Sequence, residues 1–493
     1  MKRIVKGFLF LSVLVFCCTG YTRPYTNGKG DTGAGKADSS GNFVRVSVGK
    51  SGYLELDNGD LFIPVGINIC WPRFVSSEDS VMNKMEYYLD RLGKNGGNFT
   101  RVWLSAPAFE VEHEKAGSYD EAIARRIDRL VAIAKRNGIR IKFCLENFRA
   151  LTNLPPMFAG SVPFEKPIYD QSRGGGLSSM KDFFTTAHGK ELYLKRVEFL
   201  AKRYADVPTV FGWELWNEMN SVRIEDKKII EDWTSEMLVE VKRRVPKQLV
   251  MQSLGSYDTE TATEWYRNYS VMPANQIAQV HRYLDPGAKL AVARGPMDKL
   301  AYDAVRTLKE WDLKKPVLLS EVGAVQAHHA GPSELYPKDS AGMMLHDYLY
   351  AAFFAGAAGP GQSWHWDYYI DKHDLWYQLA RFKKAIRGLD PRLEDFRPFV
   401  AEQNGLRIYG LQGKKTVLLW CRDQSNTWEE ELVKGIKPAR LSGISVSLPF
   451  KLNVAETIFY DPWTDQETVL QNGGKIKLPD FGRSGIVRLT IKN

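Results

Sequence analysis

The chain has 493 residues, of which 44% are hydrophobic and 25% charged, the profile of a soluble globular protein with room for several domains. Its net charge of +9 comes from 67 basic and 58 acidic residues without a long run of lysines and arginines, which excludes nucleic acid as the main partner. Aromatic residues make up 12%, including 13 tryptophans, which fits either a large core or a surface that stacks flat ligands.

The N-terminus has the pattern of a secretory signal. Three basic residues precede an apolar run at residues 8–16, which is too short for a confident membrane span. We therefore expect a signal peptide over residues 1–20 and a protein that is secreted, periplasmic or on the outer surface.

Cys17 and Cys18 close the apolar run, as in a bacterial lipoprotein signal. A lipid anchor is the favoured interpretation and plain secretion the alternative, and we expect no membrane contact beyond such an anchor. Residues 21–42 are rich in Gly, Ser and Asp, which predicts a flexible linker.

Between residues 43 and 395, short β-rich apolar runs alternate with amphipathic helical patterns. The clearest helix covers residues 120–138, where apolar residues recur at helical spacing and Gly138 occupies a C-terminal cap position. The expected strands are residues 61–69, 98–105, 139–147, 209–217, 248–255, 276–284, 316–324 and 361–366.

Eight strands in this order, with helices between most of them, predict a parallel sheet, and a length of about 350 residues suits a (β/α)8 TIM barrel. A doubly wound open sheet is the alternative, but residues 65–72 lack the glycine-rich first turn of that fold. A long Pro- and Gly-rich segment at residues 151–182 interrupts the pattern. Loops of this length are usually functional, so we expect it to influence substrate choice.

Residues 396–493 read as short strands separated by turn residues, which predicts a C-terminal β-sandwich domain. This domain either binds glycan, with Trp420, Trp428 and Trp463 as candidates, or braces the barrel. We favour the brace because no evenly spaced aromatic triplet is present.

Beyond the signal, the cysteines are Cys70, Cys144 and Cys421. They are far apart and odd in number, so we expect free, mostly buried thiols, with neither a disulfide framework nor a metal site. No cofactor is expected.

Candidate polar residues lie at the ends of six of the eight predicted strands, and the last strand carries aromatic ones. In a barrel these ends open onto the active face. The residues are Asn68, Arg101, Glu146, Asn147, Asn217, Glu218, His281, Tyr283, Glu321, Trp364 and Trp366.

Two of these residues are carboxylates suited to glycoside hydrolysis. Glu218 and Glu321 come from different strands, so only the fold can bring them together. One acid would protonate the leaving oxygen while the other attacks the anomeric carbon, and a separation of about 5–5.5 Å gives retention of configuration. Glu214 lies about 13 Å deeper along its strand, so we assign it to the scaffold.

The motifs around these acids resemble those of the clan A glycoside hydrolases. "WELWNE" is similar to their fourth-strand motif, "PVLLSEVGA" to their seventh-strand motif, and "FIPVGINICWP", "NFTRVWL" and "VHRYLDP" to the patterns of strands 1, 2 and 6. The likeness covers about residues 43–390. It is closest to glycoside hydrolase family 5 and its endo-β-mannanase and cellulase group.

The resemblance implies a retaining hydrolase that cleaves β-glycosidic bonds of a mannan- or glucan-type polysaccharide or oligosaccharide by double displacement. Glu218 would be the acid/base and Glu321 the nucleophile. Asn217 would bind the sugar 2-hydroxyl, and Arg101 would hold Glu321 ionised.

Further roles follow from the same resemblance. His281 would contact the acid/base and Tyr283 the nucleophile, and the period of two along a strand places both on one side. The remaining sugar-contacting candidates are Trp364, Trp366, Trp71, Trp103 and Asn147.

Two alternatives stay open at this point. The first is an exo-acting β-glycosidase of the same clan, and the second is a non-catalytic glycan-binding surface protein on an inactive barrel. The presence of both motif glutamates argues against the second. We expect a monomer that needs no metal.

Overall fold

The computed structural model describes residues 41–73, 75, 77–147, 168–222, 224 and 226–492. The predicted signal peptide, residues 21–40 of the predicted linker and residues 151–167 of the predicted long loop lie outside this range. Among the described residues, no helix has both the length and the apolar content needed to cross a membrane.

Parallel strands form the centre of the larger, N-terminal part of the described chain. Five of them, β4 to β8, pair in sequence order, and β9 pairs in parallel with β10. All are buried along their length, as expected for strands covered on both faces. Their bounds are β4 Gly66–Asn68, β5 Phe99–Trp103, β6 Arg140–Cys144, β7 Val210–Glu214, β8 Leu249–Met251, β9 Ala278–Leu284 and β10 Val317–Ala324.

An eighth extended segment closes the ring. Ser363 forms a parallel bridge with Val322 of β10, and its carbonyl accepts a hydrogen bond from the Asn68 amide of β4 at 2.9 Å. The two groups of paired strands are also joined between β8 and β9, where the Gln276 amide donates a hydrogen bond to the Val250 carbonyl at 3.1 Å. The chain therefore forms the predicted (β/α)8 TIM barrel.

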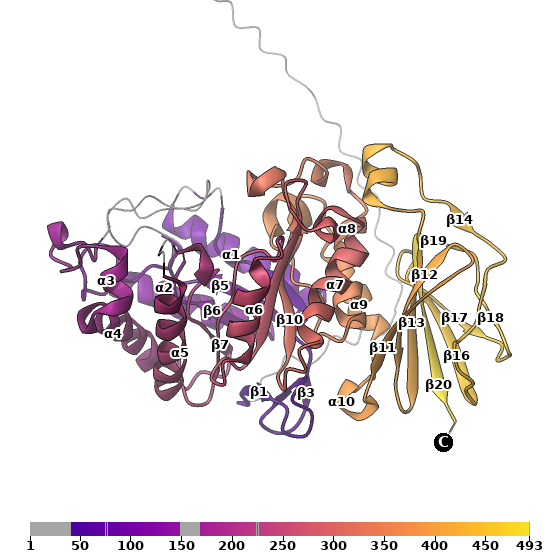
Figure 1. The fold of residues 1–493 in the computed structure, drawn as a ribbon, viewed down its shortest axis with the longest axis horizontal. Coiled ribbons are helices and arrows are strands. Elements are labelled where there is room, and N and C mark those ends of the chain that lie inside the picture. The colour runs from indigo at the N-terminus through magenta and orange to yellow at the C-terminus, as the bar shows by residue number, and fades with distance from the viewer. Residues whose placement is uncertain are drawn as a thin grey trace, which may run out of the picture. The chain divides into compact units, whose positions relative to one another are not determined.

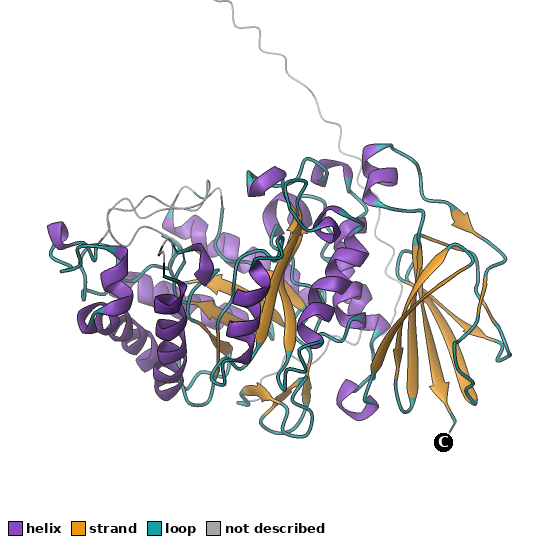
Figure 2. Ribbon diagram, in the orientation of Figure 1, coloured by secondary structure: helices purple, strands orange, loops and turns teal. Residues whose placement is uncertain are grey.

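Helices follow the strands and surround them (Figures 1 and 2). In α2, the predicted apolar face is buried and Gly138 adopts a positive φ of 67° just after the C-cap. The barrel helices are α1 Glu78–Lys94, α2 Glu121–Arg136, α4 Ala187–Tyr204, α5 Lys227–Arg244, α6 Ala262–Val271, α7 Met297–Lys309, α8 Met343–Phe354 and α9 Tyr377–Ala385, with the short additional helices α3 Met180–Thr185 and α10 Pro391–Glu394.

Several predicted strands are shorter in the structure, and two of them are interrupted. The run at residues 61–69 is divided at Pro64, which has no amide hydrogen to donate, into β3 (Leu61–Phe62) and β4. β3 instead pairs with the hairpin of β1 (Val44–Val46) and β2 (Leu54–Leu56). The run at residues 361–366 is extended only around Ser363, since a helical turn already begins at Trp366.

The C-terminal domain contains one large antiparallel sheet with strand order β11-β12-β13-β20-β16-β17 and two short strand pairs, β14-β19 and β15-β18. A short helical turn at Glu429–Val433 departs from the expectation of an all-strand domain. The strands are β11 Arg397–Gln403, β12 Leu406–Gln412, β13 Thr416–Asp423, β14 Arg440–Leu441, β15 Ser445–Val446, β16 Val454–Asp461, β17 Gln466–Leu470, β18 Ile476–Lys477, β19 Phe481–Gly482 and β20 Ser484–Ile491.

The two faces of this sheet belong to different cores. Along β13, Leu419 and Cys421 pack into the core of the sandwich with residues of the short strand pairs, while Trp420 between them packs into the barrel core. This follows from the alternation of side chains along a strand. Cys421, like Cys70 and Cys144, is a buried free thiol, as predicted.

Buried ion pairs join this sheet to the barrel helices. Arg422 of β13 forms two hydrogen bonds of 2.8 Å with Asp347 of α8, and Arg407 of β12 is paired with Asp298 of α7. The Tyr409 hydroxyl also donates to Asp298 at 2.9 Å. All four charged side chains are buried. Separating the C-terminal sheet from the barrel helices would therefore leave each of these charges without its partner.

The three candidate glycan-binding tryptophans of this domain face the barrel. Trp420 is fully buried against Tyr409 and Tyr350, and Trp428 donates its indole N–H to the Gly295 carbonyl at 3.0 Å. Trp463 packs on His346 of α8. These contacts support the brace interpretation.

We predict that Arg422→Met lowers the free energy of unfolding by about 3 to 5 kcal/mol, because it leaves the buried Asp347 carboxylate without its partner. Urea denaturation should show one transition for both parts. The matched control is Lys314→Met, whose exposed ion pair with Asp312 should contribute less than about 1 kcal/mol. Two separate transitions, or equal effects of both substitutions, would contradict the brace.

Candidate active site

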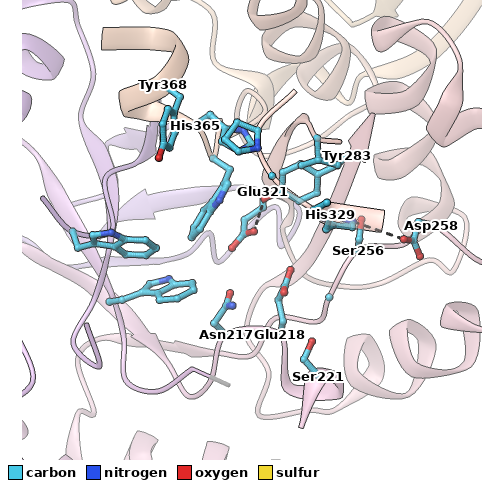
Figure 3. Close-up of a pocket in the computed structure, with 18 of the residues that line it drawn as sticks. Asn217, Glu218, Ser221, Ser256, Asp258, Tyr283, Glu321, His329, His365 and Tyr368 are labelled. Carbon is cyan, nitrogen blue, oxygen red and sulfur yellow. Dashed lines mark hydrogen bonds and ion pairs between the residues drawn. The ribbon is translucent and has the colours of Figure 1, made fainter. Parts of the chain in front are cut away.

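A cavity of about 520 Å³ opens at the carboxyl ends of the barrel strands. Its lining comes from strands β5, β9 and β10 and from the segments that follow β4, β7, β8, β10 and the eighth segment (Figure 3). The lining residues are Trp71, Arg73, Trp103, Asn217, Glu218, Asn220, Ser221, Gly255, Ser256, Asp258, Tyr283, Glu321, Val325, His329, Ala330, Gly331, Pro332, Trp364, His365 and Tyr368.

Local backbone irregularities place the two carboxylates. Strand β7 ends at Glu214, earlier than predicted, and the chain reaches Glu218 in the left-handed region with φ 53° and ψ 59°. Such a conformation is costly for a residue with a side chain and is concentrated at functional sites. Glu321 follows a register shift in β10 after Leu319, of the kind that redirects side chains.

Glu218 and Glu321 meet in the cavity, and Figure 3 shows both carboxylates pointing into it. A carboxylate oxygen of each, together with a ring nitrogen of His281, lies within 4.8 Å of the others. Burial raises the pKa of Glu218 well above its usual range, and the neighbouring Glu321 charge raises it further. Burial also raises the pKa of Glu321, but the Arg101 guanidinium and the Tyr283 hydroxyl oppose that shift.

Arg101 connects the site to the barrel interior. It is fully buried and donates to both oxygens of Glu214 at 2.7 and 2.9 Å, to the Asn217 side-chain oxygen at 2.7 Å, and to Glu321. Lys142 approaches Glu214 at 3.2 Å. Burial alone would raise the pKa of Glu214, but Arg101 and Lys142 hold it below its usual value. Glu214 is therefore an anionic anchor beneath the cavity.

His281 and Tyr283 of β9 each contact one carboxylate. The His281 Nδ1 lies 2.9 Å from Glu218, and the Tyr283 hydroxyl donates to Glu321 at 2.6 Å. Burial lowers the pKa of His281 well below its usual range, with Arg101 adding to the effect, so the ring is neutral. The period of two along β9 brings both side chains to the same face, as the sequence indicates.

One side of the cavity is aromatic. Trp71, Trp103 and Trp364 line it with ring centroids 4.9 to 5.6 Å apart. Trp366 is fully buried and packs edge-on against Trp71, so it offers no surface to a ligand. Of the sugar-contacting candidates Trp364 and Trp366, only Trp364 therefore lines the cavity. Asn147 is likewise buried and lies outside the cavity lining.

Sequence reasoning missed several lining residues that lie on loops. Arg73 stacks over Trp71 and Tyr368 and pairs with Asp367 at 3.0 Å. Asp258 follows β8, and no motif singled it out. His329, on the loop after β10, also lines the cavity.

Among the residues that the structure describes, two groups of side chains have donor atoms close enough to hold a cation. The first is Glu218, His281 and Glu321, whose negative charge is already partly balanced by Arg101. The second is Asp258, Asp285 and His329 at the edge of the cavity.

Known proteins resemble this chain in sequence and in fold. The family model described as cellulase, glycosyl hydrolase family 5, matches residues 64–352. Mannan endo-1,4-beta-mannosidase 7 of Arabidopsis thaliana is 26% identical over 308 residues, covering 58% of this chain and 68% of that protein. Putative mannan endo-1,4-beta-mannosidase 9 of Oryza sativa subsp. japonica is 26% identical over 343 residues, covering 66% and 81%.

Solved structures share the whole architecture. A glycoside hydrolase family 5 protein from Bacteroides vulgatus ATCC 8482 has a TM-score of 0.58 at 14% identity, covering 92% of this chain and 94% of its own. The endo-beta-1,4-mannanase from Thermotoga petrophila has a TM-score of 0.52 at 18% identity, covering 87% and 98%. At these identities the likeness establishes the fold alone.

We predict opposite stability effects for two glutamates of this site. Glu214→Gln should lower the free energy of unfolding by about 3 to 5 kcal/mol, because it takes an anion from two buried cations. Glu218→Gln should leave stability unchanged or raise it at neutral pH, because burial and Glu321 both disfavour the Glu218 charge. The exposed Glu198→Gln serves as control in urea denaturation, and equal losses for Glu214 and Glu218 would contradict this assignment.

Proposed function

The chain belongs to glycosyl hydrolase family 5 and is a glycoside hydrolase, and we propose that it cleaves internal β-1,4 links of a mannan chain with retention of configuration. The observation that carries the mechanism is the approach of Glu218 and Glu321 within 4.8 Å across the cavity. That spacing agrees with the short carboxylate separation of retaining enzymes and leaves no room for a water between nucleophile and sugar.

In the first step, Glu321 attacks the anomeric carbon while Glu218 gives its proton to the glycosidic oxygen. The C–O bond to the leaving sugar breaks, and an ester between Glu321 and the retained sugar forms. In the second step, Glu218 takes a proton from water, whose oxygen displaces Glu321 from the same carbon. The two inversions restore the β configuration.

The surroundings supply the different protonation states that these roles need. Arg101 and Tyr283 both donate to Glu321 and stabilise its anion. Glu218 has a neutral histidine as partner and a raised pKa, so it enters the reaction protonated. Arg101 also holds the Asn217 oxygen, which leaves the amide NH2 to donate to a sugar hydroxyl.

The substrate assignment is supported by the cavity and by the relatives. Aromatic rings suit the C–H faces of sugars, and the tryptophan wall provides them beside the catalytic pair. Relatives in two plants carry the name mannan endo-1,4-beta-mannosidase. Mannose differs from glucose in the configuration at C2, the position where Asn217 would bind.

We predict activity on β-1,4-mannan and glucomannan that exceeds activity on cellulose and mixed-linkage β-glucan, with oligosaccharides as the early products. The measurement is a polysaccharide panel with reducing-end assay and chromatographic sizing of products. Release of monosaccharide alone from the earliest time points would favour the exo-acting alternative. Higher turnover of a β-glucan than of mannan would contradict the proposed substrate.

We predict that azide distinguishes the two glutamates. With an aryl β-glycoside, Glu321→Ala plus azide should yield the α-glycosyl azide, because azide replaces the missing nucleophile and inverts the anomeric carbon once. Glu218→Ala plus azide should yield the β-glycosyl azide, because azide attacks the ester on Glu321. Without azide, both variants should lose at least about 100-fold in kcat on mannan. NMR of the products identifies the anomer that each variant forms. Wild-type turnover by either variant would contradict the mechanism.

A further inference from the structure

The cavity has a second wall that is chemically unlike the aromatic one. Ser221, Ser256, Asp258 and His329 line it, and in the view of Figure 3 Ser256 and Asp258 lie on one side of Glu218 while Asn217 and Tyr368 lie on the other. Hydroxyl, carboxylate and imidazole groups therefore face the aromatic rings across the catalytic pair.

The backbone of this wall is held in place by contacts between loops. The Asn220 side-chain oxygen accepts a hydrogen bond from the Gly255 amide at 2.7 Å and joins the loops after β7 and β8. The Asp258 carbonyl accepts from the amides of Lys289 at 3.0 Å and Leu290 at 2.8 Å. The wall is thus a rigid surface whose side chains can be preorganised for a ligand.

Two polar atoms of this wall lack hydrogen-bond partners among the described residues. The Ser256 hydroxyl has none in the described chain, and neither has the His329 Nε2. That nitrogen lies within ion-pair distance of two carboxylates, 3.8 Å from Asp258 and 3.5 Å from Asp285, which is longer than a normal N–H···O hydrogen bond. A hydroxyl-rich ligand would provide the partners that such groups require.

We propose that Ser256, Asp258 and His329 form the subsite for the leaving sugar and for sugar acceptors. This rests on the proposed function: Glu218 protonates the glycosidic oxygen, so it stands at the boundary between the retained and the leaving sugar. The tryptophans and Asn217 take the retained sugar, and the polar wall takes the other. The Asp258 carboxylate can accept hydrogen bonds from two adjacent hydroxyls of that sugar, which an aryl or alkyl group cannot donate.

The test uses partitioning of the glycosyl-enzyme. With an aryl β-mannoside as donor, the ester on Glu321 is displaced either by water or by a hydroxyl oxygen of an added acceptor, and Glu218 takes the proton in both cases. The ratio of transfer product to hydrolysis product therefore reports acceptor binding alone. Mannobiose is the sugar acceptor, and methanol is the matched acceptor without a hydroxyl array.

We predict that Asp258→Ala lowers the mannobiose transfer-to-hydrolysis ratio by about 10- to 100-fold, the size expected for hydrogen bonds to a charged group. Ser256→Ala should lower it by about 2- to 10-fold. In both variants the methanol transfer-to-hydrolysis ratio should stay within about twofold of wild type, because methanol offers no hydroxyl array to this wall. The exposed Asp312→Asn is the control and should change nothing.

Each outcome separates this inference from the proposed function. An unchanged mannobiose ratio in Asp258→Ala, or an equal fall of the mannobiose and methanol ratios, overturns the subsite while leaving the hydrolase intact. A wild type that releases no aglycone from β-mannosides contradicts the proposed substrate instead. A third outcome would assign Asp258, Asp285 and His329 to a metal and overturn the subsite. In that case EDTA would abolish wild-type activity and a divalent cation would restore it, whereas the activity of Asp258→Ala would not respond to EDTA or to the cation.

Discussion

The site depends on one buried guanidinium. Arg101 has no exposed surface, and its donors are divided among Glu214 below, Asn217 beside and Glu321 above it. Because the guanidinium is planar and its N–H donors have fixed directions, it orients the side chains that it contacts and also favours their ionised form. Glu214 holds the guanidinium through two hydrogen bonds, so Arg101 fixes the position of Glu321 from the barrel interior.

Glu218 reaches the same point by a different route. It lies beyond the last residue of β7, in a left-handed conformation, and its amide is held by the Ser253 hydroxyl at 3.1 Å. The barrel thus supplies one carboxylate from within a strand and the other from a strained turn. The strain is sustained by the packed surroundings, since the flanking residues Asn217 and Met219 are both buried.

Much of this arrangement could be predicted because it follows from strand periodicity. His281 and Tyr283 are two residues apart, so they share a face, and Glu321 shares the barrel mouth with Asn217 because parallel strands end together. What could not be predicted depends on loops and on contacts distant in sequence. Trp364 and Trp366 are equivalent in the sequence, but the helical turn that begins at Trp366 buries one and leaves the other in the cavity. Asp258 and Arg73 carry no motif, and their places become visible only with the loop backbone.

The charges of the pocket explain which acid keeps a proton. Glu214 and Glu321 are matched by the cations Arg101 and Lys142, whereas the nearest polar partner of Glu218 is the neutral His281 ring. With two anions already balanced by two cations, a third buried charge is the costly one, so the proton resides on Glu218. When that proton leaves for the glycosidic oxygen, Glu321 loses its charge to the ester bond in the same step. The net charge of the pocket then stays constant through the first half of the reaction, and the surrounding groups need not reorganise to follow it.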